Sequence, residues 1–390
     1  MARLVSARNI EGRVVIGSPS TSTRRTLGSP CVAVSNRCHG IVARIHTGGD
    51  VFHPVAAVRG LQYLLSFTGK RMAYFPLRRR QMSTPFMPCR AALVLALVLP
   101  VCAANVAARQ HPWQAPPARE PNVVAEIAGP IVQPEPSRDL DIVWVWGVDK
   151  NHERGAHEYG WVMDRFVNTL LPLVPRVTAE RAMYFPTAEQ WARADVVVFY
   201  LQSPEPWSQE QYEQIDAFQS RGGGLMFFHL AILQGAGSEL AARIGLAYAS
   251  GDSPNGPTRW GPLPTPVHLT KAGLSSEILE GFGPTVDLVD EHYWNLHGDA
   301  DGVTTLMTAP GGPALGSEAP PRPDELDGNA WPVMWTTERG RGRVFATVLG
   351  HNYFTFNDPY FRIMLLRGLA WTLGESFDPF KPLVTIHLER

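Results

Sequence analysis

The stretch SQEQYEQIDAFQSRGGGLMFFH, residues 208–229, contains the pattern that decides the fold. Ser208 precedes a helical segment and Gln211 stands three residues later, which predicts a capping box for a helix over 209–221. The three glycines at 222–224 end this helix, and the apolar run LMFF follows at once as a buried strand. His229 comes directly after the strand, so a parallel sheet would place it at the carboxyl edge, where open α/β sheets bind their ligands.

Strands and helices alternate upstream of this stretch. The apolar run DIVWVWGV at 141–148 predicts a strand covered on both faces, and the segment from Glu158 predicts a helix that crosses back over the sheet. A short strand near 176–183, a helix at 188–194 and a buried strand at 195–201 follow. Such alternation predicts a three-layer α/β domain with a mainly parallel sheet.

The C-terminal half is richer in strands. We expect strands at 265–270 and 303–309, and then a hairpin of 332–338 with 342–350. The last helix should begin with Asp358 as its cap and Pro359 at its first position, and end at Gly374. The sequence therefore predicts a single domain over 140–376, followed by a tail at 377–390.

The first 81 residues differ chemically from the rest. They contain 13 Lys and Arg against only Glu11 and Asp50, whereas the other 309 residues contain 22 basic and 34 acidic side chains. We interpret residues 1–81 as a disordered leader or an over-long gene start, and an organelle transit peptide is the competing interpretation. A net charge of -1 over the whole chain argues against a nucleic-acid partner.

Residues 82–108 have the layout of a secretory signal peptide. The run AALVLALVLPVCAANVAA follows Arg90 and is shorter than the ~20 apolar residues of a membrane span. Proline is then dense through 109–139, which predicts an exposed linker. We therefore expect export to the periplasm or beyond, and no stable membrane span.

Candidate catalytic residues follow the predicted strands. His157 lies in the loop after the first strand, His229 ends the central strand, and His351 follows the last one. The segment VDEHYWN at 289–295 adds polar and aromatic side chains, namely Asp290, Glu291, Tyr293 and Trp294. Histidine and carboxylate side chains can transfer protons or hold a divalent metal such as zinc, although no compact zinc motif is present.

Cysteine-hydrolase chemistry is excluded for the predicted domain, and serine-hydrolase chemistry lacks support. All four cysteines precede residue 103, so the predicted domain has no thiol nucleophile, and no GxSxG elbow is present. The glycines at 222–224 precede a strand instead of linking a strand to a helix, so they predict no phosphate site.

Three segments taken together resemble the trehalose-utilisation (ThuA-like) family. They are GGGLMFFHLA at 222–231, DEHYW at 290–294, and the block PVMWTTERGRGRVFATVLGHNYFTFNDPYFRIMLLRGLAWTLG at 332–374. The resemblance covers roughly residues 140–375 and implies a flavodoxin-like fold of the class I glutamine-amidotransferase type, with added strands in the C-terminal half. It also implies that His229 stands near the place of the amidotransferase elbow cysteine, in a polar site with His157, Glu291, Tyr293 and His351.

The resemblance implies use of a carbohydrate or keto-sugar. We expect His157, His229, Glu291 and His351 to act in acid-base chemistry of a hydrolase, lyase or isomerase type, with or without a metal, and Asp290, Tyr293 and Trp294 to bind a small carbohydrate. The alternative is a non-catalytic sugar-binding or interaction module on the same fold. The sequence does not specify the substrate, the cofactor or the oligomeric state.

Overall fold

The computed structural model describes residues 114–235, 237–250, 256–313 and 321–388, and the backbone of 63–68 and 71–76. The chain divides into two compact units, Met1–Arg90 and Ala91–Arg390. In the first unit, β1 (Tyr63–Thr68) pairs antiparallel with β2 (Arg71–Pro76), although the sequence predicts no regular structure before residue 82. Each strand has only six residues, too few to show a sustained period. The predicted signal peptide at 82–108 lies outside the described residues.

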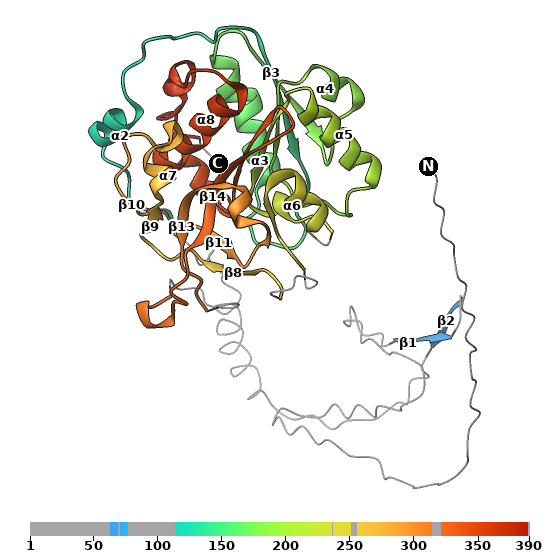
Figure 1. Cartoon of the computed structure of the whole chain (residues 1–390). Coiled ribbons are helices and arrows are strands. Elements are labelled where there is room, and N and C mark those ends of the chain that lie inside the picture. The colour runs from blue at the N-terminus through green and yellow to red at the C-terminus, as the bar shows by residue number, and fades with distance from the viewer. Residues whose placement is uncertain are drawn as a thin grey trace, which may run out of the picture. The chain divides into compact units, whose positions relative to one another are not determined.

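A nine-stranded mixed sheet forms the centre of the second unit (Figure 1), in the order β10-β9-β13-β14-β15-β6-β5-β3-β4. Its parallel part consists of β3 (Leu140–Trp146), β4 (Val177–Met183), β5 (Val196–Phe199), β6 (Gly224–Phe228) and β15 (Gly342–Thr347). Its antiparallel part consists of β9 (Val267–Leu269), β10 (Thr285–Val286), β13 (Thr304–Ala309) and β14 (Trp331–Arg339). The predicted parallel core with added C-terminal strands is confirmed.

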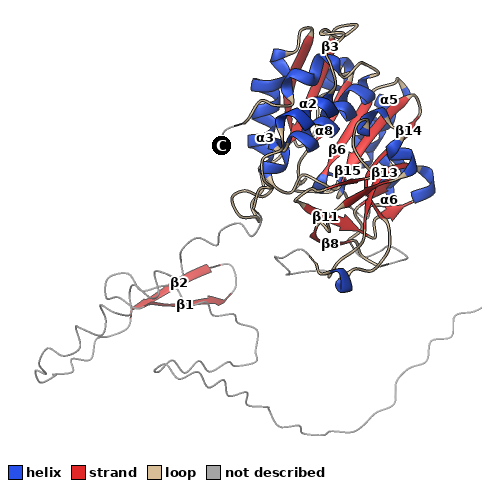
Figure 2. Ribbon diagram, turned by 90° about the vertical axis from the view of Figure 1, so that its left-hand side faces the viewer, coloured by secondary structure: helices blue, strands red, loops and turns tan. Residues whose placement is uncertain are grey.

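Helices cover both faces of this sheet. Figure 2 shows the strands between α3 and α8 on one side and α5 and α6 on the other, which gives three layers. The helices are α3 (Tyr159–Arg165), α4 (Ala188–Arg193), α5 (Gln209–Ser220), α6 (Ser238–Ile244), α7 (Lys271–Leu274) and α8 (Pro359–Leu373). Among the described residues, no helix combines the length and apolar character that a membrane span requires.

The predicted helix signals are present in the structure. Ser208 and Gln211 form the capping box of α5, and Asp358 caps α8, which ends at Gly374 in the left-handed conformation. The crossover helix after β3 is less regular than expected, because α3 continues as a π-helix (Phe166–Leu170) and a 3₁₀ turn (Leu171–Leu173). Pro172 in that turn has no N–H to donate to a longer α-helix.

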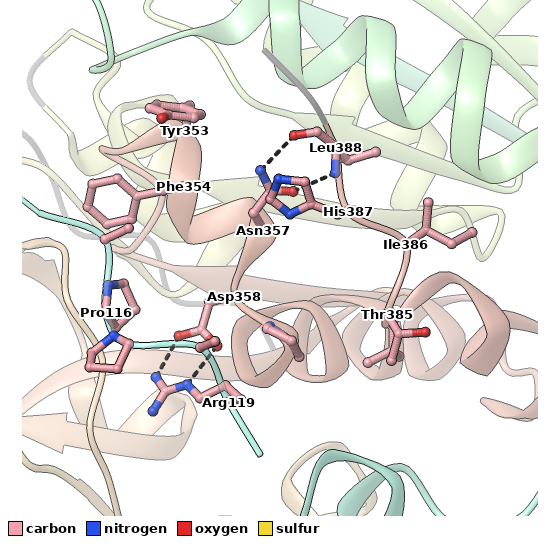
Figure 3. Close-up of a pocket in the computed structure, with 15 residues that line it drawn as sticks. Pro116, Arg119, Tyr353, Phe354, Asn357, Asp358, Thr385, Ile386, His387 and Leu388 are labelled. Carbon is pink, nitrogen blue, oxygen red and sulfur yellow. Dashed lines mark hydrogen bonds and ion pairs between the residues drawn. The ribbon is translucent and has the colours of Figure 1, made fainter. Parts of the chain in front are cut away.

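The described part of the predicted linker packs on the domain, which corrects the predicted domain start. Helix α2 (Pro121–Ala128) buries Val124 and Ile127, a pair at helical spacing. Just before it, Arg119 forms an ion pair of 2.6 Å with Asp358, the cap of α8 (Figure 3). The segment is rich in proline, so the short apolar stripe that packs on the domain is not apparent from the composition.

The C-terminal tail also belongs to the folded unit. A 3₁₀ segment (Asp378–Leu383) buries Phe380 and Leu383, and Leu388 is buried beyond it. Leu388 also receives a hydrogen bond of 2.9 Å from the Asn357 side chain at its carbonyl oxygen (Figure 3). Both ends therefore extend the domain past the predicted 140–376.

Candidate functional site

Three histidines meet at the carboxyl edge of the sheet. Strands β3, β6 and β15 run parallel, and His157, His229 and His351 follow them in the chain. His157 and His229 have φ angles of 50° and 52°. Left-handed backbone is unfavourable for residues other than glycine and persists only where the surroundings enforce it, often at functional sites. At His157, a hydrogen bond of 2.8 Å from its N–H to the His351 carbonyl fixes this conformation.

The imidazole nitrogens of the three residues are in mutual contact. His157 Nε2 lies 3.0 Å from His229 Nε2, and His351 Nδ1 lies 3.1 Å from the first and 3.2 Å from the second. These three atoms form a nearly equilateral triangle. The sequence prediction that the histidines share one site is consistent with this placement.

The tautomer of His229 follows from its second nitrogen. His229 Nδ1 lies 2.8 Å from the carbonyl oxygen of Val348, which can only accept, so Nδ1 carries the proton. Nε2 therefore points its lone pair at the other two histidines. It can accept a hydrogen bond from the Tyr293 hydroxyl, which is 2.7 Å away.

Burial keeps the His229 and His157 rings neutral. Desolvation lowers the pKa of His229 to about 3, with partial opposition from the Val348 carbonyl. Desolvation and the neighbouring histidines hold the pKa of His157 well below its usual value. Neutral imidazole is the form that donates a lone pair to a metal.

Glu291 and Tyr293 reach the histidines from a separate two-stranded arm, β8 (Arg259–Pro262) with β11 (Glu291–Trp294). Glu291 Oε1 lies 3.6 Å from His229 Nε2 and 3.5 Å from His351 Nδ1. Desolvation, with the charge of Asp290, raises the pKa of Glu291 to about 8. A protonated carboxyl beside a neutral imidazole is not an ion pair, so these contacts are polar but uncharged near neutral pH.

Asp290 orders the loop that carries His351. Its carboxyl accepts backbone N–H bonds from Gly350 at 2.7 Å, from His351 at 3.1 Å and from Asn352 at 3.3 Å. Burial raises its pKa to about 7, although these donors act in the opposite direction. Its side chain is buried beneath the loop, and these bonds hold the backbone that carries His351. The role of Asp290 in substrate binding stays a prediction.

The family model described as trehalose utilisation, ThuA, matches residues 156–372, more than half of the chain, and this range includes all three histidines. The chain belongs to the ThuA family. That membership indicates a carbohydrate-related role. A ThuA-like protein from Parabacteroides merdae ATCC 43184 has 16% identity and a TM-score of 0.46, over 60% of this chain and 90% of that one. One from Bacteroides uniformis ATCC 8492 has 14% identity and a TM-score of 0.44, over 60% and 92%. No curated protein matches the chain.

Trp294 lies away from the histidines of this ThuA-family chain, contrary to the sequence prediction. Side chains alternate along β11, so Glu291 and Tyr293 share one face while His292 and Trp294 share the other. The Trp294 ring stacks on the His292 ring, with centroids 4.9 Å apart, and is buried. Trp294 therefore contributes to the core of the arm.

Two further polar residues lie beside His157 and are not among the predicted site residues. Asp149 and His152 lie in the loop after β3, and the His152 ring centroid is 3.7 Å from that of His157. The loop sequence VDKNHERGAH at 148–157 places Asp149, His152 and His157 close together after a strand. This spacing is the sequence feature that indicates a shared polar site.

The histidine triangle fits a divalent metal. A tetrahedral zinc ion with Zn–N bonds of about 2.0–2.1 Å holds its ligand atoms about 3.3 Å apart, close to the 3.0–3.2 Å observed here. Without a cation, at least one of the three nitrogen–nitrogen contacts has no hydrogen bond, because Nε2 of His229 carries no hydrogen and the other two nitrogens offer at most two. The second contact of His229, its Nδ1–H bond to Val348, is the outer hydrogen bond that metal-ligating histidines usually make.

Proposed function

We propose that this ThuA-family protein is an enzyme that acts on a carbohydrate or keto-sugar, with His157, His229 and His351 as ligands of a divalent cation such as zinc. The observation that carries the proposal is the contact of their three nitrogen atoms at 3.0–3.2 Å. Carbohydrate chemistry is supported by the family description. When bound, the cation would supply Lewis-acid polarisation of a carbonyl or hydroxyl oxygen of the sugar.

Glu291 is the proposed proton donor and acceptor. Its carboxyl lies 3.6 Å from His229 Nε2 and 3.5 Å from His351 Nδ1, so it can exchange a proton with a sugar oxygen held near the histidines. Tyr293 hydrogen-bonds the Glu291 carboxyl and so orients it, and its hydroxyl lies 2.7 Å from His229 Nε2, whose lone pair would bind the cation.

One observation supports the alternative of a module without turnover. His229 is fully buried, and the other two histidines are nearly so. A metal enclosed in this way could stabilise the fold without contacting a substrate. The two functions differ in whether loss of a histidine changes the chemistry or only the stability.

Variants of the full chain test the proposal. Zinc content per chain is measured by plasma mass spectrometry for the parent, His229→Ala and His351→Ala, with the exposed His268→Ala as a matched control. Each site variant should contain one ion fewer than the parent and the control. Turnover of trehalose, related disaccharides and their keto derivatives is followed by NMR on the same samples, and a loss of ~100-fold or more is expected for the site variants.

Two results would contradict the proposal. Equal zinc content in His229→Ala and His268→Ala would remove the metal from this site. Lower thermal stability with full specific activity in both site variants would favour the binding module.

We also propose that the protein is exported. The support is the signal-like segment at 82–108 in the sequence, which ends in small residues of the kind that precede a cleavage site. N-terminal sequencing of the protein recovered from the periplasm or medium tests this directly.

A further inference from the structure

The loop after β3 carries a second group of metal-binding side chains. Asp149, His152 and His157 each offer a ligand atom, and these atoms lie within 4.8 Å of one another. Asp149 Oδ1 is 3.0 Å from His152 Nδ1, and Asp149 Oδ2 accepts the His152 backbone N–H at 2.9 Å. The aspartate thus fixes both the backbone and the ring of His152.

His157 links this group to the histidine triangle. Its Nε2 faces His229 and His351, while its Nδ1 is buried and has no hydrogen-bond partner in the part of the chain that the structure describes. A buried polar atom without a partner costs about 1–3 kcal/mol, so native structures rarely leave one unoccupied. The ring nitrogen that faces away from the triangle is therefore not used by any hydrogen bond among the described residues.

A cavity gives solvent access to the same place. It has a volume of about 420 Å³ and is lined by Asp149, His152 and His157 together with Glu153, Arg154 and Glu158. Three carboxylates against one guanidinium make this lining attractive to cations. The His152 side chain is 34% exposed, so an ion could reach the group without unfolding the domain.

We propose that Asp149, His152 and Nδ1 of His157 form a second divalent-cation site, so that the His157 ring bridges two ions. Two imidazoles and one carboxylate are ligands that zinc and neighbouring first-row metals accept. A neutral imidazole has one N–H, so ligation through both nitrogens requires that this proton leave to solvent as the second ion binds. The bridging role of His157 depends on the proposed function, which supplies the ion in the triangle. The second site itself is supported by the contacts between Asp149 and His152.

The second ion would lie on the open side of the site. The triangle is buried, whereas the cavity beside His152 can admit a small polar molecule. The solvent-facing metal, and with it the entry of a hydroxylated substrate toward the triangle, would therefore lie at the β3 loop.

Zinc titration of the metal-free full chain tests this inference. Stoichiometry is measured by calorimetry and by plasma mass spectrometry after gel filtration, with Zn²⁺ alone as the probe. The parent and His268→Ala should bind two ions per chain. His152→Ala and Asp149→Ala should bind one, His229→Ala should bind one, and His157→Ala should bind at most one with at least ~10-fold weaker affinity.

Cobalt provides a second measurement. Two Co²⁺ ions on one imidazole ring are magnetically coupled, so the parent should show a weaker paramagnetic signal per ion than His152→Ala loaded with one. Circular dichroism melts confirm that each variant is folded. Because Asp149 and His152 lie in a surface loop, His152→Gln is available should the alanine variant melt early.

The outcomes separate this inference from the proposed function. One zinc per parent chain that is lost in His229→Ala but retained in His152→Ala overturns the second site and leaves the first intact. One zinc that is lost in His152→Ala alone supports the second site and refutes the metal in the triangle. No zinc in the parent overturns both.

Discussion

Replacing Asp290 tests whether it positions His351 or contacts a substrate. In Asp290→Ala the backbone N–H groups of Gly350, His351 and Asn352 lose the carboxyl that accepts them, and the Glu291 N–H loses its 2.9 Å bond to the same side chain. All four donors lie in buried backbone. The loop that presents His351 would then lose its hydrogen bonds to Asp290.

The expected cost follows from these bonds. A buried donor left without a partner costs about 1–3 kcal/mol, and because the donors share one carboxyl their costs do not add fully. We expect Asp290→Ala to lower the free energy of unfolding by about 3–5 kcal/mol. Asp290→Asn keeps the shape and one acceptor oxygen, so about half of this loss is expected. Zinc affinity should fall ~10–100-fold in the alanine variant, as it does when an outer partner of a metal ligand is removed.

Urea denaturation of metal-free protein at pH 7 measures the stability term, and chelator competition measures zinc affinity. The exposed Asp301→Ala serves as a control and should stay within about 0.5 kcal/mol of the parent. A change below 1 kcal/mol in Asp290→Ala, together with unchanged zinc affinity, would refute the positioning role. Loss of turnover in Asp290→Ala without loss of stability would support the prediction that Asp290 binds substrate.

Three further predictions concern other parts of the chain. Arg119→Ala removes the ion pair with the cap of α8, so its melting temperature should fall below that of the parent. Deletion of residues up to 136 also removes α2, so that variant should melt at a still lower temperature. Equal melting temperatures in all three proteins would show that this segment is an exposed linker. Desolvation lowers the pKa of His292 to about 4, so in the folded state it binds fewer protons than in the unfolded state between pH 4 and 6.5, and its contribution to stability is lost as the pH falls through that window. On acidification from pH 7 to 4, the parent should therefore lose about 3 kcal/mol more than His292→Gln, and parallel pH profiles in urea would contradict this. The exported form should begin between Asn105 and Gln110, and an intact leader on the soluble protein would refute the predicted cleavage.

Most of the sheet could be predicted because its signals are local. Runs of apolar residues mark β3, β5 and β6, and capping residues mark the starts of α5 and α8. The histidine triangle could be predicted from the same elements, since parallel strands bring the residues that follow them to one edge. These inferences need only the order of elements.

The remaining features depend on contacts between distant segments. Asp290 meets its N–H partners about 60 residues away, in a loop whose path no local pattern specifies. The face of β11 that Trp294 occupies cannot be predicted from the sequence, because it depends on which residue begins the alternation along the strand. The sequence does not predict helix α2, because its two buried apolar residues are too few to form a pattern among the prolines. These two residues are enough to attach the helix once the surface of the domain is formed.

The separation of the three histidines along the chain would make metal binding at the triangle a reporter of complete folding. Pairs among them are 72, 122 and 194 residues apart, so an N-terminal fragment, a partly folded intermediate or a chain with one misplaced strand would not assemble the triangle. Because only the native state would bind, ligand linkage would add about 4 kcal/mol of stability when free metal is a thousandfold above its dissociation constant. The absorbance of bound Co²⁺ could then measure the fraction of correctly folded molecules for each variant in a library, and this measurement requires no substrate.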